Sequence, residues 1–175
     1  MADFTPKSQI LGFLFTSAAG TCLHFLFDLT GQSLAAALVS AVNESIWEHM
    51  KLIFVPMFLV AGWQYRSYRE PDFWCRKMKS ILIGLILIPV LYYTYTGILG
   101  VSADWFNVTI FFLAAGAAYR WEALAVLEGR SCRISDKLAL TILILIAGIF
   151  AVLTFYPPEI PFFRDPITGT YGYIG

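Results

Sequence analysis

The sequence predicts an all-α membrane protein: a polytopic bundle of five transmembrane helices with a short outer half-helix and an ordered C-terminal tail. Apolar residues make up 58% of the 175-residue chain and charged residues only 14%, whereas charged residues are roughly a quarter of a soluble globular domain. The charge is clustered between long apolar runs. Five of these runs are long enough to cross about 30 Å of hydrocarbon.

We place the five spans at residues 10–27, 48–65, 80–96, 105–121 and 138–156. The apolar stretch 33–42 is too short to cross, so it predicts a half-helix or re-entrant piece before the second span. The length predicts a single integral membrane domain over residues 1–175, in which residues 156–175 form the tail. The first apolar run is too long for a signal peptide, and no convincing cleavage site follows it.

The charge of the loops predicts the orientation in the cell membrane. The loops after the second and fourth spans are basic, with Arg66, Arg69, Arg76, Lys77 and Lys79 in one and Arg120, Arg130, Arg133 and Lys137 in the other. The other two connections carry almost no basic residue. By the positive-inside rule, both basic loops and the N-terminus are cytoplasmic and the C-terminus is extracytoplasmic.

Polar residues that loop solvation cannot explain gather on the extracytoplasmic half. The outer ends of the first three spans carry His24 with Asp28, the segment 43–51 and the segment 92–97. Ionisable groups in a span are costly unless they face a partner or a wet cavity. We therefore interpret this convergence as a site. The second to fifth spans show few polar residues in the inner half, which favours a surface site over a transport path.

The first span has one polar face. Steps of about 100° per residue put Ser17, Gly20, Thr21, His24 and Asp28 within one stripe. His24 and Asp28 fit a pair of metal ligands or a carboxylate-oriented general base. In the alternative interpretation, His24 bonds to a neighbouring helix and Asp28 lies in interfacial water.

The start of the second span brings two acids together. Glu44, Glu48 and Lys51 share one helix face, and His49 is turned about 100° further. Two carboxylates one turn apart repel each other unless a cation or a shared proton intervenes. Lys51 supplies that charge in one interpretation. A divalent metal supplies it in another, and mixed imidazole and carboxylate ligation suits zinc, iron or manganese.

The predicted metal ligands are therefore His24, Glu44, Glu48 and His49, and the predicted catalytic residues are Glu44, Glu48 and His49. A metal-free acid–base or substrate-binding cluster and a structural polar network remain open alternatives. The predicted substrate-binding residues extend this set. Tyr92, Tyr95 and Thr96 share a face of the third span, where hydroxyl groups can bind a substrate oxygen, although tyrosines also form the aromatic belt of membrane proteins.

The tail completes the predicted substrate site. Its Asp-Pro and Thr-Gly steps predict turns rather than a helix. In one interpretation the tail is a lid over the outer mouth, with Arg164 or Asp165 reaching the cluster. In the other it is an interfacial strap without chemistry. The full predicted substrate-binding set is Asn43, Lys51, Tyr92, Tyr95, Thr96, Arg164 and Asp165.

The cysteines and the net charge exclude other classes. Cys22, Cys75 and Cys132 match no zinc or redox spacing and suggest no disulfide framework, so we expect all three to be inert. The formal net charge is zero, which gives no reason to expect nucleic acid as a partner. The expected partners are the lipid bilayer and a lipid or small-molecule substrate.

Four motifs resemble a family of small bacterial integral membrane proteins of unknown function. They are Leu-His-Phe at 23–25, Asn-Glu-Ser-x-Trp-Glu-His-x-Lys at 43–51, Tyr-Thr-Tyr-Thr-Gly at 93–97, and a tail motif at 157–172 that includes Asp-Pro-x-Thr-Gly-x-Tyr-Gly. The resemblance implies a topology but no reaction. It places these residues at motif positions: His24, Asn43, Glu44, Trp47, Glu48, His49, Lys51, Tyr95, Asp165 and Thr168. The sequence departs from the pattern at Asp28 and Glu159, where similar chains carry Glu and His, so the resemblance does not support a ligand or catalytic role for either.

Two main functions follow from these observations. The first is metal-dependent, hydrolase-like chemistry at the outer leaflet, on an ester or amide of a lipid or small amphiphile. The second is a binding or transport protein in which the acidic cluster takes up a cation or protons. A structural membrane partner with a satisfied polar core is the third option.

Overall fold

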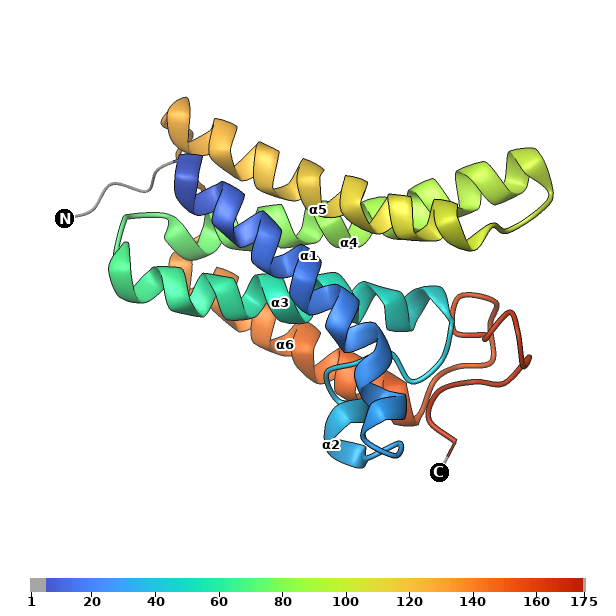
Figure 1. Cartoon of the computed structure of the whole chain (residues 1–175). Helices are drawn as coiled ribbons and strands as arrows, with labels where there is room; N and C mark the ends of the chain where they lie inside the picture. The colour runs from blue at the N-terminus through green and yellow to red at the C-terminus, as the bar shows by residue number, and fades with distance from the viewer. Residues whose placement is uncertain (1–5, 175) are drawn as a thin grey trace.

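The computed structural model describes residues 6–174 and is a bundle of long helices (Figure 1). Five of these helices are long and apolar enough to cross a membrane, as predicted. The elements in chain order are α1 (Pro6–Leu29), α2 (Leu34–Ala37), α3 (Ile46–Ser67), α4 (Phe73–Leu99), α5 (Asp104–Leu127) and α6 (Asp136–Phe155). Large apolar side chains such as Leu145 on α6 remain exposed on the outside of the bundle, as expected for helices that face lipid.

The helix ends differ from the predicted spans in two places. Helix α4 begins at Phe73, so Lys77 lies in its first turns and not in the preceding loop. The predicted half-helix 33–42 is helical only over Leu34–Ala37. Ser33 caps this short helix, because its side chain accepts a hydrogen bond from the Ala36 N–H at 3.2 Å.

The connections are sorted between the two ends of the bundle. The start of α1 and the α3–α4 and α5–α6 connections lie at one end, which we call the basic end (Figure 1). Helix α2, the α4–α5 connection and the C-terminal tail lie at the other end, which we call the tail end. The two basic loops therefore share one end of the molecule, as the orientation prediction requires.

Two glycines let α1 lie close against its neighbours. A Cβ added at Gly20 would lie 2.6 Å from the Leu52 carbonyl oxygen of α3 and 2.5 Å from the Phe111 ring of α5. A Cβ added at Gly12 would lie 2.6 Å from the Tyr119 ring. Small residues allow such close approach between membrane helices. They place the last turns of α1 beside the start of α3.

A disulfide joins Cys75 to Cys132 at the basic end. The Cys75 N–H donates to Asp136 Oδ1 at 3.1 Å, and the Cys132 N–H donates to Asp72 Oδ2 at 3.0 Å. The expectation that all three cysteines are inert is wrong for these two. They lie 57 residues apart in sequence, and only the packing of α4 beside the α5–α6 connection brings them together. Cys22 is free and exposed.

A buried ion pair between α4 and α5 lies nearer the basic end. Lys77 Nζ of α4 is 2.7 Å from Glu122 Oε1 of α5, and both side chains are almost completely buried. The Tyr119 and Thr16 hydroxyls are 2.8 Å apart on the same side of the molecule. This half is thus more polar than expected from the sequence, because Lys77 was assigned to a loop and Glu122 lies one residue beyond the predicted fourth span, 105–121.

Candidate metal centre

Helix α1 carries His24 to the tail end of the bundle. Gly20, Thr21 and His24 line a cavity there, whereas Asp28, one turn further along α1, is exposed and outside that lining. Three members of the predicted polar stripe therefore face the cavity. Asp28 does not join His24, so the predicted pairing of these two residues as metal ligands or as a base with its carboxylate is not observed.

Glu44 is fixed by the residues on either side of it. The Ser45 N–H donates to Asn43 Oδ1 at 2.9 Å, and Asn43 Nδ2 donates to the Gly172 carbonyl of the tail at 3.1 Å. Ser45 Oγ accepts from the Glu48 N–H at 3.4 Å and so caps α3. The backbone at Glu44 is thereby held between the tail and the first turn of α3.

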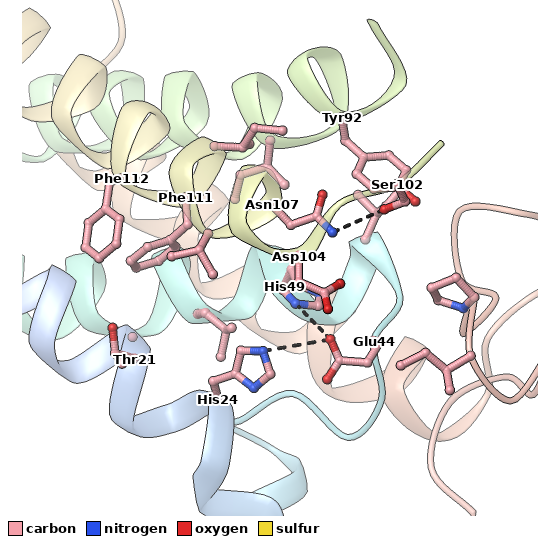
Figure 2. Close-up of a pocket in the computed structure, with 18 of the residues that line it drawn as sticks. Thr21, His24, Glu44, His49, Tyr92, Ser102, Asp104, Asn107, Phe111 and Phe112 are labelled. Atoms are coloured by element: carbon pink, nitrogen blue, oxygen red, sulfur yellow. Dashed lines mark hydrogen bonds and ion pairs between the residues drawn. The ribbon is translucent and has the colours of Figure 1, made fainter. Parts of the chain in front are cut away.

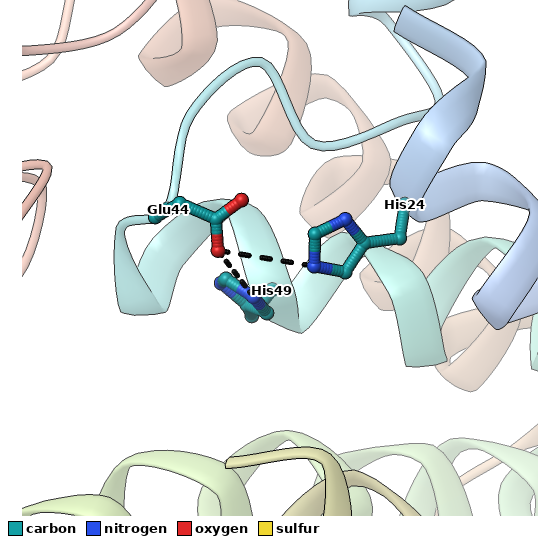
Figure 3. Close-up of side chains that lie close together, drawn as sticks. All are labelled: His24, Glu44 and His49. Atoms are coloured by element: carbon teal, nitrogen blue, oxygen red, sulfur yellow. Dashed lines mark ion pairs between the residues drawn. The ribbon is translucent and has the colours of Figure 1, made fainter. Parts of the chain in front are cut away.

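His24, Glu44 and His49 converge on one point (Figure 3). Glu44 Oε2 lies 3.8 Å from His24 Nε2 and 3.4 Å from His49 Nε2. One ligand atom from each residue lies within 4.8 Å of the others, an arrangement that could hold a metal ion. All three side chains are half-buried. The prediction that a histidine of the first span meets residues of the 43–51 segment is therefore confirmed.

The orientation of the His49 ring favours a cation in this group. His49 Nδ1 lies 2.9 Å from the Ser45 carbonyl oxygen, which only accepts hydrogen bonds, so Nδ1 carries the hydrogen. In the neutral ring, Nε2 then presents a lone pair to the Glu44 carboxylate. Two lone pairs face each other stably only when a proton or a metal ion lies between them. Metal-binding histidines commonly donate their second N–H to a backbone carbonyl in this way.

Glu44 is suited to the ionised form. Its hydrogen bond with His49 lowers the pKa of the carboxyl group, and positive charge on His49 and His24 lowers the pKa further. Partial burial acts in the opposite direction but is the weaker influence overall. A carboxylate is the form of the side chain that binds a metal ion, whereas protonated histidines would hold Glu44 as an ion pair without a metal, because only a neutral imidazole is a ligand.

Two of the three distances are close to those around a small divalent ion. Ligand atoms at about 2.0–2.2 Å from a tetrahedral ion are roughly 3.3–3.6 Å apart. The His49–Glu44 distance of 3.4 Å already meets this requirement, and the His24–Glu44 distance of 3.8 Å requires only a small closure. Two imidazoles and one carboxylate form the donor set of catalytic zinc sites and of non-haem iron(II) sites, both of which leave positions open for water or substrate.

Glu48 is held elsewhere and does not belong to this group. Its Oε2 is 2.5 Å from Lys51 Nζ and accepts from the Val42 N–H at 3.1 Å, and its Oε1 accepts from Thr154 Oγ1 at 3.0 Å. Lys51 also donates to the Ala37 carbonyl and to Thr154 Oγ1, each at 2.8 Å. The predicted ligand role of Glu48 is not supported by this geometry, because its carboxylate already has a buried cationic partner.

The three converging side chains lie along one wall of a cavity of about 730 Å³ (Figure 2). Thr21, Phe111 and Phe112 lie on one side of them, and Tyr92 and Ser102 lie on the other. Pockets of about 300–1,000 Å³ are typical of small-molecule sites. The complete lining is Gly20, Thr21, His24, Phe25, Glu44, Ile46, His49, Leu52, Ile88, Tyr92, Ser102, Asp104, Asn107, Val108, Ile110, Phe111, Phe112, Pro166 and Ile167.

A smaller cavity of about 380 Å³ adjoins the first and shares four lining residues with it, namely Glu44, Ile46, Tyr92 and Pro166. Its remaining lining consists of Tyr93, Thr96, Pro161 and Arg164. We call it the polar mouth, because it lies between α4 and the tail and carries the Arg164 guanidinium.

The structure separates the predicted substrate-binding residues into two sets. Tyr92, Thr96 and Arg164 line one or both cavities. The polar groups of the other four residues form hydrogen bonds within the protein, and those of Asn43 and Lys51 are described above. The Tyr95 hydroxyl bonds to Ser102, to the Ala103 N–H and to Asn107. The Asp165 carboxylate accepts hydrogen bonds from the Ile167 N–H and from Thr168. These internal bonds stabilise the connections that surround the cavity.

Three polar residues of the cavity were missed in the sequence analysis: Ser102, Asp104 and Asn107. They belong to the α4–α5 connection and the first turns of α5, at the same end as His24. A signal was available, because Asp104 and Asn107 are polar residues one turn apart at the start of a predicted span. They were overlooked because a polar residue at a helix start is usually explained by solvation.

The tail contributes to the wall of the cavity and is also tied to the bundle. Pro166 and Ile167 line the cavity, whereas the Trp47 N–H donates to the Phe162 carbonyl at 3.3 Å and the Tyr173 N–H donates to the Thr154 carbonyl at 2.8 Å. Phe163 is buried, with its ring centroid 4.9 Å from that of Trp47. The tail therefore has features of both predicted alternatives, the lid and the strap.

Residues 4–173 match the model of a family described as "Family of unknown function (DUF6512)". The chain belongs to this family, as the motifs at 23–25, 43–51, 93–97 and 157–172 indicated in general terms. No curated protein and no solved structure matches the chain.

Proposed function

We propose that this member of a family of unknown function is a metal-dependent hydrolase that acts on an ester or amide bond of a lipid or small amphiphile. One observation carries the proposal: His24, Glu44 and His49 point to a common position in the wall of a cavity that is largely apolar. The donor set supports a metal ion with open coordination positions. The cavity supports a substrate with a long apolar part.

The chemistry requires a nucleophile and a route for protons. A divalent ion held by His24, Glu44 and His49 would act as a Lewis acid and would bring the pKa of a bound water to about 7. That water would add to the carbonyl carbon, the C–O or C–N bond would break, and the leaving group would take up the proton that the water loses. Among the described lining residues, Asp104 is the carboxylate besides Glu44, so we assign the proton transfer to Asp104. The Tyr92 hydroxyl is placed to bind a substrate oxygen.

The same proposal includes the orientation. The basic residues gather at the end opposite the cavity, and the positive-inside rule then places the tail end outside the cell membrane. The Cys75–Cys132 disulfide of the basic end argues for the opposite orientation, because disulfides are rare in the cytoplasm. The substrate bond is attacked at the level of the outer leaflet. Zinc, iron(II) and manganese are all compatible with two imidazoles and one carboxylate.

Turnover by the purified full-length protein tests the proposal. The protein is depleted of metal with a chelator and then supplied with Zn²⁺, Fe²⁺ or Mn²⁺ in turn, with a medium-chain p-nitrophenyl ester as a generic amphiphile. We expect that hydrolysis requires one of these ions. The variants Glu44→Gln and His49→Ala should each lower the hydrolysis rate by at least about a hundredfold. Hydrolysis that is insensitive to the chelator, or equal in both variants and the unmodified protein, would contradict it.

Transport of a cation or of protons is a second candidate, favoured by the buried Lys77–Glu122 pair. Paired ionisable groups inside membrane spans often mark ion pathways. However, most buried α3 and α4 side chains between this pair and the tail end are apolar, among them Ile53, Phe54, Met57, Ile81 and Leu85, and the buried Ser80 hydroxyl there donates to the Ala118 carbonyl. Proteoliposomes loaded with a pH-sensitive dye test this candidate: proton flux that is lost in Glu122→Gln would favour it, and equal dye response with empty liposomes would exclude proton transport.

A further inference from the structure

The cavity has an apolar arm that reaches the lipid-facing surface. Phe25 of α1 and Val108 and Phe112 of α5 line the arm, and their side chains are 58%, 54% and 38% exposed. In a membrane, these surfaces contact acyl chains. Figure 2 shows Phe111 and Phe112 beside Thr21 of α1. A lipid chain can therefore enter sideways between α1 and α5, without crossing the polar mouth.

The polar mouth is lined by Arg164, whose guanidinium forms no ion pair within the described part of the chain. Arg164 is exposed and lines this mouth with Thr96 and Tyr92. Among residues 6–174, its guanidinium takes part in none of the ion pairs. Guanidinium groups bind carboxylate and phosphate oxygens through paired hydrogen bonds. Arg164 therefore offers an anionic group a guanidinium at this mouth, and Glu44, which lines both cavities, places a carboxylate where the mouth meets the larger cavity.

The positions of the apolar arm, the candidate metal centre and the polar mouth indicate what kind of molecule the cavity can hold. Phe112 of the arm lies on one side of His24, Glu44 and His49, and Tyr92, which also lines the mouth, lies on the other (Figure 2). A cavity of about 730 Å³ has the size of typical single-ligand pockets, so it holds one chain of a lipid rather than two. Any second chain would remain in the bilayer.

We infer that the occupant is an anionic lipid of the surrounding leaflet, with one acyl chain in the arm between α1 and α5 and its charged headgroup at Arg164. This inference names the substrate class of the proposed hydrolase and rests on that proposal for its chemistry. The bond between headgroup and chain then lies next to His24, Glu44 and His49. Binding of the lipid itself depends on the arm and on Arg164, so it is measurable without a metal ion.

Spin-label electron paramagnetic resonance tests the inference on full-length, chelator-treated protein in phosphatidylcholine bilayers. The probes are a chain-labelled stearate, its methyl ester and a labelled alkyltrimethylammonium, and the readout is the relative association constant of each. We expect the anionic probe to associate about tenfold more strongly than the other two, as for a charge-assisted hydrogen-bonded contact. Arg164→Gln should abolish that preference, whereas Arg133→Gln, which changes an exposed arginine of the opposite end, should keep it.

A second pair of variants tests the arm. Val108→Trp fills the arm and should weaken the association of all three probes severalfold. Val152→Trp is the matched control, because Val108 and Val152 are similarly exposed, at 54% and 57%, and it should leave the association unchanged. Equal association of all probes with the unmodified protein, preserved preference in Arg164→Gln, or unchanged association in Val108→Trp would overturn the inference.

The metal content of the same preparations distinguishes this inference from the proposed hydrolase. Stoichiometric metal without anionic-lipid preference would overturn the inference and leave the metal centre. Anionic-lipid preference in a protein that binds no metal would overturn the hydrolase and support the lipid site alone.

Discussion

Glu44 and Glu48 lie four residues apart and have opposite surroundings. The Glu48 side chain is 1% exposed and meets a lysine that is completely buried. The Glu44 side chain is 39% exposed and meets two histidines beside a cavity. Both acids carry a negative charge near the start of α3. The difference lies in what balances that charge, a fixed ammonium group for Glu48 and two imidazoles for Glu44.

The two glutamates therefore have different roles, a structural one for Glu48 and a candidate chemical one for Glu44. The Glu48–Lys51 pair of α3 bonds to Ala37 of α2, to Val42 of the α2–α3 connection and to Thr154 of α6. It therefore joins three helices, and these bonds occupy the polar atoms that a substrate would need. The group of His24, Glu44 and His49 keeps one face towards the cavity. Charged residues in one short motif thus divide into a structural pair and a candidate metal centre.

The largest effect is expected from breaking the buried pair. Lys51→Ala leaves the Glu48 carboxylate without its cation, and such changes cost about 3–5 kcal/mol of unfolding free energy. The double variant Glu48→Gln/Lys51→Met removes both charges and should cost less than about 1.5 kcal/mol, because paired removal is often nearly neutral. Unfolding in mixed detergent micelles measures both. Equal losses in the two proteins would show that the pair is not a coupled unit.

A smaller loss of unfolding free energy is expected from a change at Gly172, where the tail packs against Thr154 beside this pair. Gly172 has φ +61°, and a Cβ there would lie 2.5 Å from the Thr154 carbonyl oxygen and 2.7 Å from Pro157. Gly172→Ala should therefore cost about 2–3 kcal/mol of unfolding free energy. Gly169→Ala is the matched control, since Gly169 has φ +75° but its nearest neighbour is the flexible Arg164 side chain at 3.2 Å. It should cost only about 1–2 kcal/mol, and a control loss as large as that of Gly172→Ala would contradict the account of the tail.

The smallest effect on stability is expected at Glu44. The side chain is half-exposed and pairs with histidines rather than with a buried cation. In the presence of chelator, Glu44→Gln should change the unfolding free energy by less than about 0.5 kcal/mol. The same unfolding assay measures this value. A loss comparable to that of Lys51→Ala would mean that Glu44 is a structural residue like Glu48.

The sequence predicted the parts of this arrangement that depend on hydropathy and helical periodicity. The five long helices follow from the lengths of the apolar runs, and the polar stripe of the first span identified the face that carries His24. Periodicity could not assign Glu48, because Glu44, Glu48 and Lys51 share one helix face in projection. The structure begins α3 at Ile46, so Glu44 precedes the helix and turns towards His24 independently of Glu48.

Contacts between distant segments could not be predicted from one sequence. The Thr154 hydroxyl that joins Glu48 lies 106 residues away in the chain, and the Cys75–Cys132 disulfide and the Lys77–Glu122 pair likewise depend on how helices pack. Arg164 was predicted to lie near the cluster from the turn-rich tail, and it lines the polar mouth. Whether it binds substrate stays a prediction.

The most direct test is the metal content of three purified proteins after equilibration with Zn²⁺, Fe²⁺ or Mn²⁺ and removal of excess ion. The unmodified protein should hold close to one ion per chain, Glu44→Gln should hold almost none, and Glu48→Gln/Lys51→Met should hold as much as the unmodified protein. Metal that persists in Glu44→Gln, or that is lost equally from the double variant, would contradict the assignment of His24, Glu44 and His49 as the metal centre.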